Sequence, residues 1–238
     1  MDNVAEALQY VATLKDQINE RCVKEIDGRK YVFGKPSPVM NPEAPRLGLH
    51  TLTGLVGYIK ANVDGLKPET LLVHVDTPTC VTLLSAVFGP FKQREVLVCA
   101  EPILPAFRFD RFMPSEDFII GLNAMFTEAG DRDALLADVA AIKIEAGGAI
   151  KDDGTSQTVS VEAGARLLSQ RKTKPRVTLH PYCTFQEIEQ PARQFLFRLD
   201  KEGQPGLFVA DGEAWRNKAM DAIQEWLTDC LPDMHIIA

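Results

Sequence analysis

The chain has 238 residues, 45% of them hydrophobic, which is enough for one sizeable core or for one domain with a small appendage. Its formal net charge of −7 argues against broad contact with nucleic acid or anionic membranes, because such contact needs a basic face. Five cysteines occur singly without a CxxC pair, so we expect neither a disulfide framework nor a metal site, and no cofactor.

The N-terminal 46 residues are predicted to form an appendage to a main domain over residues 47–238. Strands over 23–26 and 30–33 flank Asp27-Gly28, a turn dipeptide typical of hairpins. The first segment also carries acids where a secretory signal has basic residues, which predicts a cytoplasmic protein. Apolar residues at three- and four-residue steps predict an amphipathic first helix: Val4, Leu8, Val11, Leu14 and Ile18. Prolines then predict an extended arm: Pro36, Pro38, Pro42 and Pro45.

The main domain begins with a predicted short helix over 51–63, followed by strands over 70–75, 81–87 and 94–98. A helix over 116–128 is expected to be capped by Ser115. Helical residues 131–139 and strands around Asp153-Gly154 come next. A strand over 176–179 follows the polar stretch 169–174.

The last quarter of the chain has the clearest pattern. Residues 193–200 alternate apolar and polar side chains, turn at 201–206 and return over 207–211, which predicts a β-hairpin. Residues 213–231 then carry apolar side chains at helical spacing. The whole order predicts an α+β fold, mainly antiparallel sheet with helices packed on one side.

Two groups of residues suggest enzyme chemistry. His74 and Asp76 lie two apart on a predicted strand, so they would share a face and could bind a metal or act as a base. His180 and Cys183 place an imidazole near a thiol. Neither pair has the further ligands or orienting group that catalysis requires, so a hydrolase remains the alternative to a structural role.

Other residues are candidates for contacts between subunits. The basic residues Arg171, Lys172 and Lys174 are expected in a loop, either solvated or facing an acidic neighbour. Phe107 and Phe109 either pack on the core or form an exposed anchor. The apolar tail with Ile236 and Ile237 is expected to be tied to its own domain or to a neighbouring copy.

Several segments together resemble the YfdQ-like family of phage and prophage proteins. They are LHTLTGLVGYIKANV, FIIGLNAMF, LADVAAIKIEAGGAIKDDGTSQTVSVEAG and QFLFRLDKEGQPGLFVADGEAWRN, and the likeness extends from residue 45 to residue 230. The resemblance implies a non-enzymatic protein of a bacterial host cell whose partners are copies of itself, in a closed shell, and phage or host recombination proteins. It supplies no catalytic residues.

A third reading is an acidic inhibitor of a host DNA-processing or defence protein. Such a mimic of DNA needs a continuous negative surface, which 26 basic residues interspersed among 33 acidic ones dilute. A self-assembling structural protein is therefore the function that the sequence favours.

Overall fold

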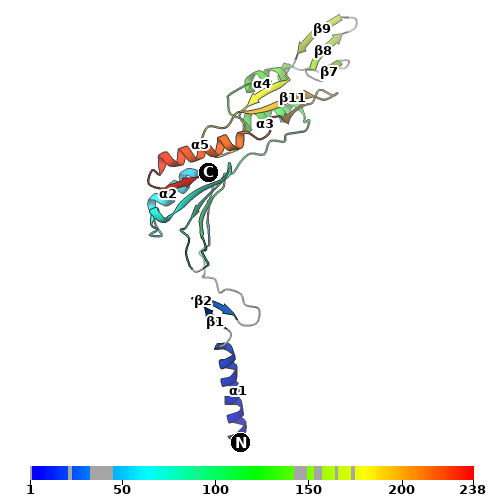
Figure 1. The fold of residues 1–238 in the computed structure, drawn as a ribbon. Helices are drawn as coiled ribbons and strands as arrows, with labels where there is room; N and C mark the ends of the chain where they lie inside the picture. Colours follow the sequence, from blue (N-terminus) through cyan, green and yellow to red (C-terminus); the bar gives the residue numbers. More distant parts are fainter. Residues whose placement is uncertain are drawn as a thin grey trace. The chain divides into compact units, whose positions relative to one another are not determined.

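The computed structural model describes residues 2–20, 23–32, 45–89, 91–141, 149–152, 157–163, 166–172 and 175–238 (Figure 1). The chain divides into two units. The first comprises Met1–Pro45 and Ser85–Glu95, and the second comprises Arg46–Leu84 and Val96–Ala238. None of the helices in the described part combines the length and apolar character needed to cross a lipid bilayer.

The first unit contains the predicted helix and hairpin. Helix α1 spans Asp2–Glu20, and strand β1 (Val23–Ile26) pairs antiparallel with β2 (Arg29–Val32). Asp27 and Gly28 have φ values of 52° and 75°, the left-handed backbone that a two-residue hairpin turn of this kind requires. The proline arm, with Pro36, Pro38 and Pro42, lies outside the described residues.

The second unit is built on a five-stranded sheet in the order β13-β4-β5-β6-β3. The central three strands form the predicted antiparallel meander, and the two edge strands join it in parallel. The strands are β3 (Leu47–Leu49), β4 (Leu72–Thr77), β5 (Cys80–Leu84), β6 (Val96–Ala100) and β13 (His235–Ile237). A short 3₁₀ helix, η1 (Pro68–Thr70), precedes β4.

One face of this sheet is covered by α2 (Leu52–Ala61) and α5 (Trp215–Cys230) (Figure 1). Alternate strand residues point toward these helices and are fully buried, as the two-residue period of a strand requires. The first core therefore joins three groups of side chains: Val73, Val75, Val81, Leu83 and Val98 from the sheet, Leu52 and Leu55 from α2, and Ile223 and Leu227 from α5.

A second core lies on an antiparallel sheet of β10 (Arg176–Leu179), β11 (Arg193–Leu199) and β12 (Pro205–Val209). Helices α3 (Ser115–Met125) and α4 (Arg132–Ala141) pack their apolar faces on it. The predicted hairpin and the α+β fold are thus confirmed. Ser115 is not the cap that we expected: it begins the helix, and Pro114 occupies the capping position without a side-chain hydrogen bond.

A third sheet consists of β7 (Ala149–Asp152), β8 (Gln157–Ala163) and β9 (Arg166–Lys172). The prediction of a basic loop was wrong for Arg171 and Lys172, because both belong to β9, which pairs antiparallel with β8. Lys174 lies outside the described residues.

The C-terminal tail belongs to the sheet of its own chain. Strand β13 runs parallel to β4, with Ile236 opposite Val73, and Gln224 Nε2 donates a hydrogen bond to the Ile236 carbonyl at 3.2 Å. Ile236 packs against the first core, whereas Ile237 is 46% exposed. Of the two partners considered for the tail, its own domain is the one observed, so Ile236 is a core residue.

Candidate functional site

His74 and Asp76 lie on β4, but the strand does not present them as a pair. Val75 is opposite Val81 and Thr77 is opposite Cys80, so Asp76 is the extra residue of a β-bulge and the regular alternation breaks there. His74 is half-buried, and Asp76 is exposed. Among the described residues no hydrogen bond or ion pair joins these two side chains, so the dyad required by a hydrolase is not formed.

His180 and Cys183 are held separately by one buried residue, Gln190. The His180 ring nitrogen Nδ1 lies 2.9 Å from the Gln190 carbonyl, and Gln190 Oε1 accepts from the backbone N–H of Cys183 at 2.9 Å. Gln190 Nε2 donates to the Phe185 carbonyl at 2.9 Å. These hydrogen bonds pair the polar backbone groups of a turn, and the imidazole is bonded to a backbone carbonyl instead of to the thiol.

The Cys183 thiol lines a cavity of about 260 Å³ together with Tyr182 and Trp215. Burial raises the pKa of Cys183 to about 11, although the nearby Arg193 acts in the opposite direction. Since a thiolate is the reactive form, the raised pKa of this half-buried cysteine disfavours a role as a nucleophile.

Phe107 and Phe109 are half-buried and pack against the second core, so of the two alternatives considered for them core packing is the one observed. The Phe109 ring stacks on Phe195 with centroids 5.0 Å apart, and Phe107 meets the edge of Phe126 at 5.1 Å. Gly121 makes this packing possible, because a Cβ there would lie 2.8 Å from the Phe107 ring.

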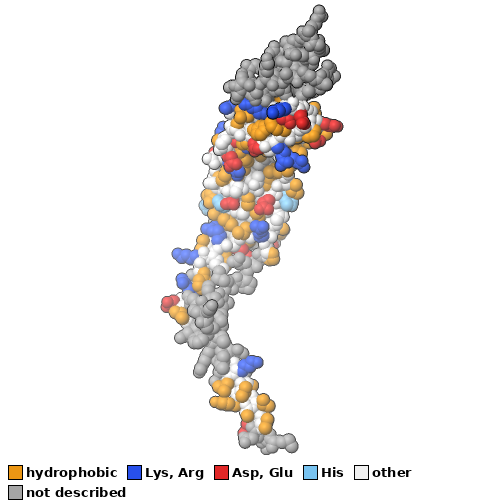
Figure 2. Space-filling view, turned by 90° about the vertical axis from the view of Figure 1, so that its right-hand side faces the viewer, with side chains coloured by type: hydrophobic (Ala, Val, Ile, Leu, Met, Phe, Trp, Pro, Cys, Tyr) orange, Lys and Arg blue, Asp and Glu red, His pale blue; other side chains and the backbone are white. Residues whose placement is uncertain are grey.

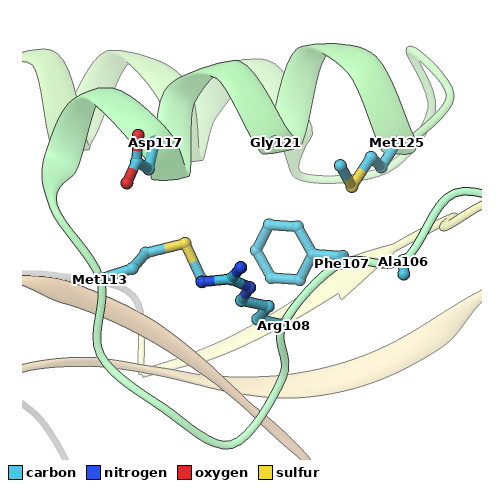
Figure 3. Close-up of a pocket in the computed structure, with 7 residues that line it drawn as sticks. All are labelled: Ala106, Phe107, Arg108, Met113, Asp117, Gly121 and Met125. Carbon is cyan, nitrogen blue, oxygen red and sulfur yellow. The ribbon is translucent and has the colours of Figure 1, made fainter.

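A shallow cavity of about 280 Å³ lies between α3 and the segment that contains Phe107 (Figure 3). Met113 and Met125 form part of its lining, and its two charged groups, Arg108 and Asp117, are exposed to solvent. Because both charged groups are exposed, this cavity lacks the desolvated acid or base that a catalytic site would show.

A cluster of two thiols and a carboxylate lies at one end of the five-stranded sheet. Cys80 begins β5, Cys99 lies near the end of β6, and Glu101 follows β6 directly. Their three ligand atoms all lie within 4.8 Å of one another, and the two Sγ atoms are 3.6 Å apart.

Sequence reasoning missed this cluster because the two cysteines are 19 positions apart and resemble no metal-binding spacing. The predicted strands over 81–87 and 94–98 also left both cysteines just outside. The antiparallel register was the available signal. It places Thr82 opposite Cys99 and Val81 opposite Ala100, so Cys80, Cys99 and Glu101 share one face.

The apolar face of α1 is exposed. Val4 is 68% exposed, Leu8 65% and Val11 60%, and Leu14 is 39% exposed. Figure 2 shows hydrophobic side chains along this helix at the lower end of the view. An exposed apolar stripe of this length marks α1 as a candidate contact surface.

Comparisons of the chain with protein families, with curated proteins and with solved structures found no match. The resemblance to the YfdQ-like family stays a prediction from the sequence.

Proposed function

We propose that the protein is a non-enzymatic structural subunit that self-associates, and that α1 is an association element. The exposed apolar face of α1 is the observation that carries the proposal. Most of the stability of helices in proteins comes from the packing of an apolar face, so α1, with 19 residues, would gain stability from a partner that covers this face.

The spacing of the exposed residues favours a second copy of the same helix as the partner. Val4, Leu8, Val11 and Lys15 follow one another at steps of four, three and four, the spacing of the central positions in a coiled coil. A single lysine at such a position is a known determinant of register and of the number of helices. The lysine therefore restricts how copies can pair.

We call the line of Val4, Leu8, Val11 and Lys15 the seam of α1. The residues that flank this seam also permit identical helices to meet. Coiled coils usually carry charges at the flanking positions, and like charges there keep identical helices apart. In α1 these positions hold only uncharged residues, while Glu6 takes an outer position. The flanking residues are Ala5, Ala7, Ala12 and Leu14.

The exposed area sets the strength of the expected contact. Fully burying a valine or leucine contributes about 1.5–3 kcal/mol, so covering the exposed fractions of Val4, Leu8, Val11 and Leu14 contributes roughly 4–7 kcal/mol per helix before ordering costs. Association itself costs an estimated 4–15 kcal/mol. One helix pair thus supports a weak contact, and a stable assembly requires several contacts per subunit acting together.

The biological setting in this proposal comes from the resemblance. A phage-encoded subunit that forms a closed homo-oligomeric shell and acts beside recombination proteins agrees with an exposed self-pairing helix and with the absence of a formed catalytic dyad among the described residues.

Substitution of the seam tests the proposal. Leu8→Glu with Val11→Glu should shift the particle to smaller species, because the two charges would be buried against a neighbouring helix. The matched control is Gln9→Glu with Thr13→Glu, which adds the same charge to the outer side of α1 and should keep the native mass. Light scattering coupled to size exclusion gives the mass. Equal masses for both variants and the wild type would remove α1 from the assembly.

A further inference from the structure

The thiol and carboxylate cluster has the composition and spacing of a metal site. We propose that Cys80, Cys99 and Glu101 bind one Zn²⁺ ion, with a fourth position open to water. The three residues belong to the second unit, so a failure of the proposed self-association leaves this proposal untouched.

The distance between the sulfur atoms fits a shared ion. Zinc binds thiolate sulfur at about 2.3 Å in a tetrahedral arrangement, so two sulfur ligands of one ion lie about 3.8 Å apart. Cys80 Sγ and Cys99 Sγ are 3.6 Å apart, so almost no movement is needed. The Glu101 carboxylate lies within 4.8 Å of both sulfurs and is exposed, so its side chain can turn to an ion that arrives from solvent.

A disulfide is the competing use of two adjacent thiols, and the register disfavours it. Cys99 is opposite Thr82, so Cys80 is its diagonal neighbour across the strand pair. Diagonal neighbours have Cα atoms about 7–8 Å apart, whereas a disulfide needs about 4.4–6.8 Å. An ion between the sulfurs spans this separation, and a direct bond would require the strands to move.

The position of Glu101 is fixed from the neighbouring strand end. Its backbone N–H donates to the Leu49 carbonyl at 2.8 Å, and its carbonyl accepts from His50 Nδ1 at 2.9 Å. Leu49 ends β3, which pairs in parallel with β6. The carboxylate ligand is therefore attached to a backbone that is held on both sides.

Burial raises the pKa of Cys99 to about 12, and the hydrogen bond with Cys80 acts in the same direction. A divalent cation reverses this preference because it stabilises both thiolates. Thiol ligands must lose their protons to bind a cation, so the affinity should rise with pH.

The test uses the full chain, freed of metal by a chelator and kept reduced, and titrates it with Co²⁺ as a spectroscopic substitute and then with Zn²⁺. We expect one Co²⁺ per chain, with the charge-transfer absorption of cobalt–thiolate bonds, and its displacement by Zn²⁺. Cys80→Ser and Cys99→Ser should each weaken binding at least tenfold and reduce that absorption, and Glu101→Gln should weaken binding while keeping the absorption.

Cys183→Ser is the matched control, since it replaces a half-buried thiol with a raised pKa that lies outside the cluster. It should bind Co²⁺ as the wild type does. If the buried Cys99 variant fails to fold, loss of binding in the half-exposed Cys80→Ser, with binding retained in Cys183→Ser, decides the question. No stoichiometric ion, ion binding unchanged in Cys80→Ser, or a disulfide between Cys80 and Cys99 would overturn the proposal.

Discussion

Replacing Asp211 with asparagine should destabilise the protein through a single buried ion pair. Arg193 Nε donates to Asp211 Oδ2 at 2.7 Å, and the two side chains are only 10% and 8% exposed. The Arg193 guanidinium also lies over the Trp215 ring, with its central carbon 4.9 Å from the ring centroid. Removing the carboxylate charge leaves this cation buried among aromatic rings without its counterion.

The expected loss of unfolding free energy depends on which hydrogen bonds asparagine retains at position 211. Asp211 accepts from Arg193 with Oδ2 and from the backbone N–H of Glu213 with Oδ1, at 2.9 Å. Asparagine has a single side-chain oxygen, so it keeps one of these two hydrogen bonds and turns an NH2 group toward the other donor. Exchanging a charged hydrogen bond for a neutral one, with a cation left uncompensated, should lower the free energy of unfolding by about 2 kcal/mol. Asp211→Ala removes the acceptors as well, and breaking a buried pair in this way costs about 3–5 kcal/mol.

Urea unfolding measures these differences, and the emission of Trp215 in a Trp226→Phe background reports on the cluster directly. Glu213→Gln is the control, because the Glu213–Arg216 ion pair is exposed at 62% and 48% and should contribute less than about 1 kcal/mol. Equal costs for Asp211→Asn and Glu213→Gln would refute the reasoning.

The effect should also depend on pH. Burial, the largest single cause, would raise the pKa of Asp211, but the hydrogen bond and charge of Arg193 and the backbone hydrogen bonds together outweigh burial, and the net pKa is lowered. The unfolded chain then binds the proton more readily, so the stabilisation is present above the ordinary carboxyl pKa and is lost as pH falls through the folded value. The difference between wild type and Asp211→Asn should therefore shrink in acid.

Two further experiments test the packing around Gly121 and the role of the C-terminal tail in the fold. Gly121→Ala should cost about 1–3 kcal/mol and alter the near-ultraviolet circular dichroism, because the added Cβ meets the Phe107 ring at 2.8 Å. Gly57→Ala, in α2 with open space around it, should instead stabilise by about 0.5–1 kcal/mol; equal shifts would contradict the packing argument. Deleting Met234–Ala238 should lower the urea midpoint and leave the native mass unchanged, because Ile236 packs against the first core of its own chain. A smaller particle with an unchanged midpoint would show instead that the tail contributes to contacts between subunits.

Much of the fold could be predicted because its signals are local. The alternation over 193–200 and the Asp27-Gly28 turn each determine a conformation within a few residues, and both hairpins are found where they were expected. The two parallel edge strands could not be predicted. β3 and β13 have three residues each, too few for a period, and they are strands because β6 and β4 lie beside them.

The candidate sites also differ in whether local sequence or contacts between distant segments determine them. His74 and Asp76 look paired in the sequence because a regular strand would align them, and one bulge separates them. Cys80 and Cys99 look unrelated, and the strand register brings them to 3.6 Å. Phe107 and Phe109 alternate with charged residues, as in a surface strand. They nevertheless pack against the second core, beside aromatic residues of α3 and β11.

The central claim is that the chain acts as an assembly, and its native mass tests that claim most directly. Sedimentation velocity of the untagged wild type across micromolar concentrations should show a defined species at a multiple of the 26.3 kDa chain, well above a dimer. Dilution should shift that species as one unit if several weak contacts hold it together. A 26.3 kDa monomer throughout the range would contradict the account.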